Sequence, residues 1–155
     1  MRKFSKKAIR SWLDTLAKVC VKTRDDFTCQ IQHEGCAGTM MPLDNNCQWC
    51  HIISRNSNNL RWVLLNALCG CGHCHQWAHA NPTAFGVWFA NKYPYRYEYL
   101  NAPRKLRTWR EPDFRLIEKQ LLLKAIDLEV DVLHVPTISG HRRRFEIRIE
   151  ELKGK

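Results

Sequence analysis

The cysteines of this chain are clustered in one segment, and this clustering limits the folds that the chain can form. Seven of the eight cysteines lie between Cys29 and Cys74, and Cys20 alone lies outside that segment. In a cytosolic chain, cysteines are metal ligands or free thiols rather than disulfides. With 155 residues, the chain has the length of one compact domain. We therefore expect a small fold that is held together in part by a metal ion.

The expectation of a cytosolic chain comes from its apolar segments. The longest apolar run is far shorter than the roughly 20 residues that span a bilayer. The basic segment at the start, MRKFSKKAIRSW, has neither the apolar core nor the cleavage site of a signal peptide. We therefore predict a cytoplasmic protein with no membrane partner.

The net charge indicates a polyanionic partner. The chain has 25 Lys and Arg residues against 15 Asp and Glu residues, which gives a formal charge of +10. A basic side chain that neutralises a phosphate releases bound counterions, and this favours nucleic acid. The same charge also fits a basic surface that keeps the protein in solution. We expect DNA, contacted mainly through its phosphates, and the sequence leaves the oligomeric state open.

Hydrophobic periodicity predicts an α+β fold. Helical spacing of apolar residues predicts helices over 5–24 and 113–128, the second capped by Asp113. Further helices are expected from residue 72 and from Pro82. The remaining segments are assigned by composition: a strand over 47–53, a polar loop over 54–61, an irregular stretch over 94–112, and a β-hairpin over 130–152.

The segment 50–79 contains the residues that indicate chemistry. Cys71 and Cys74 form a Cys-x-x-Cys pair, whose sulfurs can share one zinc ion. His75 and His79 are four residues apart, so on a helix both imidazoles point the same way and can hold one ion. His51 precedes them in a strand-like run. Each piece alone is a weak signal; the ordered set is more specific, and it comprises His51, Asn66, Cys71, Cys74, His75 and His79.

This ordered set resembles the HNH, or ββα-metal, endonuclease motif. In that family a strand carries the first histidine, a loop carries the asparagine, and a helix carries the remaining histidines. The wider sequence, including WLDTLAKVCVKTRDDFTC and HIISR, is similar to phage recombination endonucleases of the NinG (Rap) type. The likeness covers 9–128 and is strong across 47–82. It implies a nuclease domain over 1–128 with its core at 25–93, and action in the cytoplasm of a bacterial host. The predicted hairpin lies outside the likeness and forms an extension over 129–155.

The resemblance also implies roles for individual residues. His51 would be the general base that activates water, since a neutral imidazole can accept a proton near pH 7. Asn66 would orient that imidazole and hold the loop. His75 and His79 would bind one catalytic divalent ion, Mg²⁺, Mn²⁺ or Zn²⁺, which polarises the scissile phosphate. Cys50 occupies a position that is often an Asp or His metal ligand in the family, so it is either a soft ligand that favours zinc or a buried thiol.

The structural zinc has two possible ligand sets. Cys29 and Cys36 together with Cys71 and Cys74 would form a treble-clef site, which leaves His51 on a free strand facing the helix. Spacing alone also permits a zinc ribbon that replaces the first pair with Cys47 and Cys50. We favour the first set, because neighbouring strand residues face opposite ways and a zinc-bound Cys50 would turn His51 elsewhere.

The polar loop contributes two candidate DNA contacts. Arg55 and Arg61 could clamp phosphates, or they could be ordinary surface arginines. The leading hypothesis is thus a DNA endonuclease. The likeness suggests branched or recombination DNA as its substrate, but the motif sets the chemistry and not the substrate shape, so the preferred DNA shape and cut-site sequence stay open. The first alternative is a non-catalytic zinc-ribbon or treble-clef module that binds nucleic acid. A weaker third is an adaptor that contacts a protein partner through the 130–152 hairpin.

Overall fold

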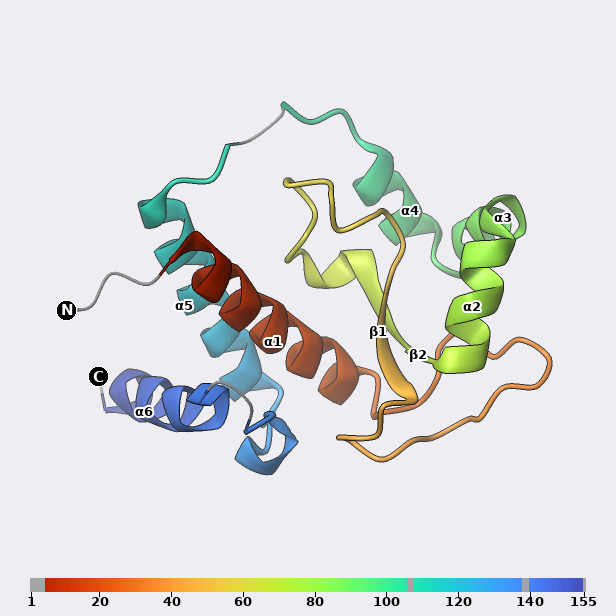
Figure 1. The fold of residues 1–155 in the computed structure, drawn as a ribbon. Helices are drawn as coiled ribbons and strands as arrows, with labels where there is room; N and C mark the ends of the chain where they lie inside the picture. The colour runs from red at the N-terminus through yellow and green to blue at the C-terminus, as the bar shows by residue number, and fades with distance from the viewer. Residues whose placement is uncertain (1–4, 106–107, 138–139, 155) are drawn as a thin grey trace.

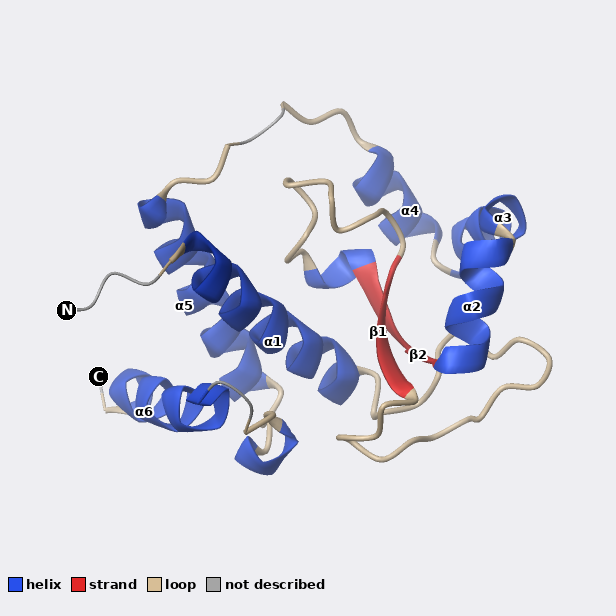
Figure 2. Ribbon diagram, in the orientation of Figure 1, coloured by secondary structure: helices blue, strands red, loops and turns tan. Residues whose placement is uncertain are grey.

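The computed structural model describes residues 5–105, 108–137 and 140–154. In these residues the protein has six α-helices and one small two-stranded antiparallel sheet, so the α+β prediction is confirmed (Figure 1, Figure 2). The Cys-rich loop, the sheet and α2 lie on one side of the molecule, and α5 and α6 lie on the other (Figure 1). The long first helix, α1 (Lys6–Arg24), connects the two sides.

The predicted N-terminal helix is confirmed. Ser5 caps α1 by accepting a hydrogen bond from the Ala8 amide at 3.2 Å. Its apolar stripe packs against α5 (Glu111–Asp127), which confirms the predicted second helix. Asp113 does not cap α5 as predicted; it sits one turn in and accepts from the Arg110 amide at 2.8 Å.

The sheet and the helix after it form one continuous β–β–α unit. Strand β1 (Cys47–His51) pairs with β2 (Ala67–Cys71), with Cys47 opposite Cys71 and His51 opposite Ala67. The loop between the strands ends in a short 3₁₀ turn, η1 (Leu64–Asn66). Helix α2 (Gly72–Ala80) begins directly after β2, as predicted.

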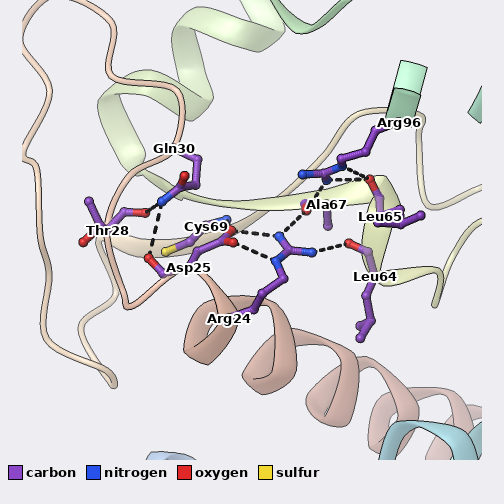
Figure 3. A network of polar contacts seen from close by, with 9 residues as sticks. All are labelled: Arg24, Asp25, Thr28, Gln30, Leu64, Leu65, Ala67, Cys69 and Arg96. Carbon is purple, nitrogen blue, oxygen red and sulfur yellow. Dashed lines mark hydrogen bonds and ion pairs between the residues drawn. The ribbon is translucent and has the colours of Figure 1, made fainter. Parts of the chain in front are cut away.

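Arg24 fixes the corner of this unit to the end of α1 (Figure 3). Its guanidinium donates to the carbonyls of Leu64 at 2.8 Å and Ala67 at 2.9 Å. Asp25 pairs with Arg24 and accepts from the Cys69 amide at 2.7 Å. Charged side chains thus bond to backbone groups just before and within β2. These hydrogen bonds hold the hairpin against the end of α1.

The segment after α2 is more helical than the sequence predicted. Helix α3 (Pro82–Lys92) begins at its proline as expected. The prediction of an irregular 94–112 is wrong for its first half, because α4 (Pro94–Asn101) is a helix. Pro94 is tolerated at its first turn. Arg96 anchors α4 by donating to the carbonyls of Leu65 and Ala67, at 3.0 and 2.9 Å (Figure 3).

The predicted C-terminal hairpin is wrong. The tail forms a short 3₁₀ turn, η2 (Val132–His134), and a helix, α6 (His141–Lys153). The alternation of Phe145, Ile147 and Ile149 suggested a strand, but the pair that packs inward is Phe145 and Ile149, four residues apart on one helix face. Ile147 is 47% exposed. The Ser139-Gly140 turn of that prediction falls partly on residue 139, outside the described residues.

Candidate metal and catalytic site

Four cysteine sulfurs meet between the Cys-rich loop and the start of α2. The Sγ atoms of the four cysteines all lie within 4.8 Å of one another. A tetrahedral zinc with Zn–S bonds of about 2.3 Å needs sulfur–sulfur distances of about 3.8 Å, so a small contraction completes the site. The group could therefore hold a structural metal ion such as zinc, and its members are Cys29, Cys36, Cys71 and Cys74.

Local backbone geometry brings these sulfurs together. Gly35 and Gly38 have φ of +77° and +70°, a left-handed conformation that glycine adopts without strain. They turn the loop so that Cys36 lies beside Cys29, whose amide donates to the Gly38 carbonyl at 3.0 Å. On the other side, Cys71 caps α2, and the Cys74 amide donates to its Sγ at 3.4 Å.

The pKa shifts in the group favour ionisation of the Cys71 thiol over the thiols of Cys36 and Cys74. Burial opposes ionisation of Cys71, but hydrogen bonds from the Ala37 and Cys74 amides outweigh it and lower its pKa to about 7. Burial raises the pKa values of Cys36 and Cys74. A bound cation reverses these raised values, because it deprotonates coordinating thiols.

The competing zinc-ribbon assignment is not the one that the structure forms. Cys47 lies in the core, with its Sγ 3.5 Å from the Sγ of Cys69. Cys50 is 1% exposed and lies against Gly70, so it belongs to the sheet core. Cys20 is buried in α1 and donates to the Leu121 carbonyl at 3.5 Å, as expected for a core thiol.

The two histidines of α2 form a close pair. The Nε2 atoms of His75 and His79 are 3.0 Å apart, and His79 is exposed. His75 Nδ1 lies 2.6 Å from Oε1 of Gln48 on β1. An amide oxygen accepts, so Nδ1 carries the proton and the Nε2 lone pair of His75 accepts the hydrogen bond from Nε2 of His79; a metal ion would bind in place of that hydrogen bond. Burial, and secondly the neighbouring His79, lower the pKa of His75.

His51 lies apart from that pair. Its ring packs on Trp49 with centroids 4.1 Å apart, and its Nε2 is 3.4 Å from the Arg61 carbonyl. Gln48 and His51 are three residues apart on β1, so their side chains leave opposite faces of the strand. Since Gln48 contacts His75, the structure does not bring His51 to the side of the sheet that holds His75 and His79.

The environment of His51 nevertheless keeps its imidazole neutral. Burial lowers the pKa of His51 to about 4, although the hydrogen bond to the Arg61 carbonyl opposes the shift. A carbonyl can only accept, so Nε2 carries the proton and Nδ1 keeps the lone pair. The ring is therefore unprotonated at neutral pH, with Nδ1 open to a proton, and its lowered pKa makes it a weaker base than a free imidazole.

Asn66 holds the loop between the strands. Its side chain is fully buried, and its Oδ1 accepts from the Ile53 amide at 2.8 Å. Its Nδ2 donates to the carbonyls of Ile53 at 2.9 Å and Leu60 at 3.2 Å. The loop-holding role expected of Asn66 agrees with these contacts, but it is the Arg61 carbonyl rather than Asn66 that bonds His51.

The two loop arginines differ. Arg61 pairs with Asp14 on α1 through two hydrogen bonds of 2.9 and 2.7 Å, and Trp62 donates to the same carboxylate. Arg61 therefore has a structural partner already. Arg55 is exposed and contributes only its backbone carbonyl to Arg61, at 3.5 Å. Of the two, Arg55 is the one whose charge is open to a phosphate.

Cys50 is not placed with the histidine pair. Within the described ranges, the four-cysteine group is the one set of three or more metal-binding side chains that converge, and Cys50, His75 and His79 are outside it. Burial raises the pKa of the Cys50 thiol. The reading of Cys50 as a plain buried thiol agrees with this position better than a ligand role.

Gln48 is a site residue that the sequence reasoning missed. It contacts His75 because α2 lies against β1, and this packing follows from the chain turning back directly after β2. The alternation of β1 puts Gln48 on the same face as Cys50. The sequence therefore showed that Gln48 and Cys50 share a strand face. The contact of Gln48 with α2 could not be predicted without knowing the register in which β1 pairs with β2.

Comparisons with known proteins give no relatives: no family model matches the chain, and no curated protein or solved structure does either. In the part of the chain that the structure describes, none of the helices has the length and apolar character needed to cross a membrane.

Proposed function

We propose that this protein is a metal-dependent DNA endonuclease of the HNH type. The observation that carries the proposal is the pair of imidazoles on α2, with Nε2 atoms 3.0 Å apart beside a four-cysteine group. The order of elements also agrees with it: a strand ending in His51, a loop pinned by Asn66, and a helix bearing His75 and His79. The Cys-rich loop joined to a strand–helix junction is the arrangement expected of a treble-clef site.

The imidazole pair has the spacing of two ligands of one ion. With metal–nitrogen bonds of about 2.05 Å, neighbouring ligand nitrogens lie about 3.3 Å apart at a tetrahedral ion and about 2.9 Å apart at an octahedral one. Gln48 holds His75 in the tautomer whose Nε2 can bind. Imidazole ligands favour zinc or a similar transition ion over magnesium. A divalent ion bound there would polarise a phosphate and stabilise the leaving oxygen.

His51 is the proposed general base, and its position sets a condition on the mechanism. It is neutral at pH 7 and offers Nδ1 as the acceptor of a water proton. It is also the last residue of β1, on the strand face opposite to Gln48. For His51 to act on a phosphate held at His75 and His79, the end of β1 must reorganise when DNA binds. Arg55, on the loop that follows, would contact a neighbouring phosphate.

A plasmid-nicking assay with matched variants tests the proposal. Zinc-loaded protein supplied with Mg²⁺, Mn²⁺ or Zn²⁺ should convert supercoiled plasmid to open circles. His51→Ala and His75→Ala should each abolish nicking, whereas His73→Ala, an exposed histidine on the same helix, should retain it. Wild-type protein that cuts no DNA with any of these ions refutes the proposal, as does equal nicking by His51→Ala.

One observation favours a second function, a non-catalytic zinc-stabilised module that binds nucleic acid. It is that the histidine pair lacks a third converging ligand among the described residues. The two functions differ in the number of bound ions. The nuclease predicts two ions per chain by elemental analysis, one of which is lost when His75 and His79 are both changed to Ala. The module predicts one ion that survives this change.

A further inference from the structure

A basic groove of about 600 Å³ lies between the start of α1 and the start of α6, away from the histidine pair. We propose that this groove binds the phosphate backbone of nucleic acid, as a contact surface additional to the nuclease site; its use on DNA rests on the function proposed above. The basic and hydroxyl side chains that line the groove are those of Lys7, Arg143, Arg144, Arg148, Ser5 and Ser11.

The charge of the groove is one-sided. Four of its lining residues are Lys or Arg, and the described residues that line it include no Asp or Glu. Glu118, which does not line the groove, pairs with Arg144 at 2.6 Å and lies 3.7 Å from Arg148, and Arg148 also pairs with Glu151. Lys7 and Arg143 are exposed, and no carboxylate of the described residues pairs with either. Two cations are thus available to neutralise phosphates.

The fixed partners of the groove give it a defined shape. Arg144 stacks over Trp12 with its guanidinium carbon 4.7 Å from the ring centroid, while it pairs with Glu118. His141 Nδ1 lies 2.9 Å from the Thr15 hydroxyl. These contacts fasten the start of α6 to α1, so the two walls have one relative position. The walls of the groove are therefore preformed, and only the exposed side chains of Lys7 and Arg143 must be ordered when an anion binds.

Backbone amides add to the positive character of the groove. Helix α6 starts after Gly140, which has φ +69° and provides no side-chain cap. The amides of its first turn therefore have no side-chain acceptor from their cap residue. The positive end of a helix attracts phosphate. In the groove this effect adds to the Lys and Arg charges.

The α1 side of the groove ends at Ser11, one turn before a contact with the loop of the nuclease site. Lys7, Ser11 and Asp14 follow at spacings of four and three residues, which places them on one stripe of the helix. Asp14 holds Arg61 of that loop. At 1.5 Å per residue, Lys7 and Asp14 are about 10 Å apart along the helix, and this is about three steps of a DNA strand at 3.4 Å each. The groove and the Asp14–Arg61 pair are thus about three nucleotide steps apart along α1.

The chemistry favours nucleic acid over an anionic membrane. A helix that binds a membrane surface needs a broad apolar face to bury among the lipids. Among the large hydrophobic side chains that are well exposed, Ile147 is the one that lines this groove. A groove of cations with a single exposed aliphatic side chain fits a phosphodiester backbone.

The test is DNA binding by the full-length, zinc-loaded protein, measured by fluorescence anisotropy on a duplex without the added catalytic ion. The variant Lys7→Ala/Arg143→Ala removes the two unpaired cations. The control Arg115→Ala/Lys119→Ala removes two exposed cations from α5, away from the groove. Because each lost phosphate contact lowers the slope of log K against log salt by about 0.9, the groove variant should lose about 1.8 in slope. That corresponds to about 60-fold weaker binding in 0.1 M salt, if the affinities at 1 M salt are equal.

The outcomes separate this proposal from the nuclease. Groove and control variants with equal slopes and affinities overturn the groove proposal, as does binding to phosphatidylserine vesicles with none to DNA. Loss of affinity restored by Lys7→Arg/Arg143→Lys supports it, and equal circular dichroism spectra exclude misfolding. If wild-type protein binds DNA through the groove but never nicks it, the nuclease fails while the groove proposal holds.

Discussion

Replacing Asn66 should destabilise the protein strongly, because this one side chain holds both ends of the loop between the strands. Asn66→Ala removes three hydrogen bonds of a fully buried side chain, of 2.8, 2.9 and 3.2 Å, and takes their side-chain partner from the amide and carbonyl of Ile53, while the Leu60 carbonyl keeps the Val63 amide. At about 1 kcal/mol for each bond, the free energy of unfolding should fall by about 3 kcal/mol. Asn66→Asp should cost more, since it places a carboxylate against two carbonyl oxygens.

Urea unfolding with saturating zinc measures this change. With an m-value of about 2 kcal/mol/M, the midpoint of Asn66→Ala should fall by about 1.5 M urea. Asn56→Ala is the matched control, because Asn56 is an exposed asparagine of the same loop, and its stability should stay within about 0.5 kcal/mol of wild type. If Asn66→Ala unfolds at the wild-type midpoint, the account of the loop is refuted.

Three further predictions concern the metal, the buried histidine and the sheet core. A zinc chelator should lower the helical circular dichroism signal and the melting temperature, because metal-binding energy at the cysteine group is folding energy; an unchanged melting curve contradicts this. Unfolded His51 takes up a proton near pH 6.5 and folded His51 only near pH 4, so stability should be full above about pH 6.5 and decline toward pH 4. His51→Gln should show a shallower decline in urea midpoints over that range, and equal slopes would count against the buried imidazole. In the same assay, Gly70→Ala should lower the free energy of unfolding by about 1–3 kcal/mol, since its Cβ would lie 2.5 Å from Sγ of Cys50. The control is Gly86→Ala in α3, where a Cβ meets open space, and it should raise the free energy of unfolding by about 0.5–1 kcal/mol.

Local sequence signals predicted the elements that have clear boundaries. Ser5 before an apolar helical stripe predicted α1, and the metal-ligand spacing of α2 predicted a helix that begins at Gly72. The C-terminal helix was missed because Phe145, Ile147 and Ile149 fit a period of two as well as a helical face. Only packing against α1 and α5 distinguishes the two, and short sequence patterns do not contain that information.

The sequence predicted which residues could be metal ligands, but it did not predict which way the site side chains point. Spacing left two candidate partners for the Cys-x-x-Cys pair, and the favoured one, Cys29 with Cys36, is the one whose sulfurs converge. The side from which His51 leaves the sheet depends on where β1 begins, since a shift of one residue turns every side chain to the other face. Gln48 for His75, and the Arg61 carbonyl for His51, are contacts that long-range packing creates.

A crystal structure of the protein with manganese and a DNA duplex, with anomalous data, would show whether the histidine pair of α2 holds the catalytic ion. We expect an anomalous peak between the Nε2 atoms of His75 and His79, a DNA phosphate on that ion, and His51 turned toward the same phosphate. Manganese absent from the pair, with DNA bound elsewhere and His51 still packed on Trp49, would contradict it.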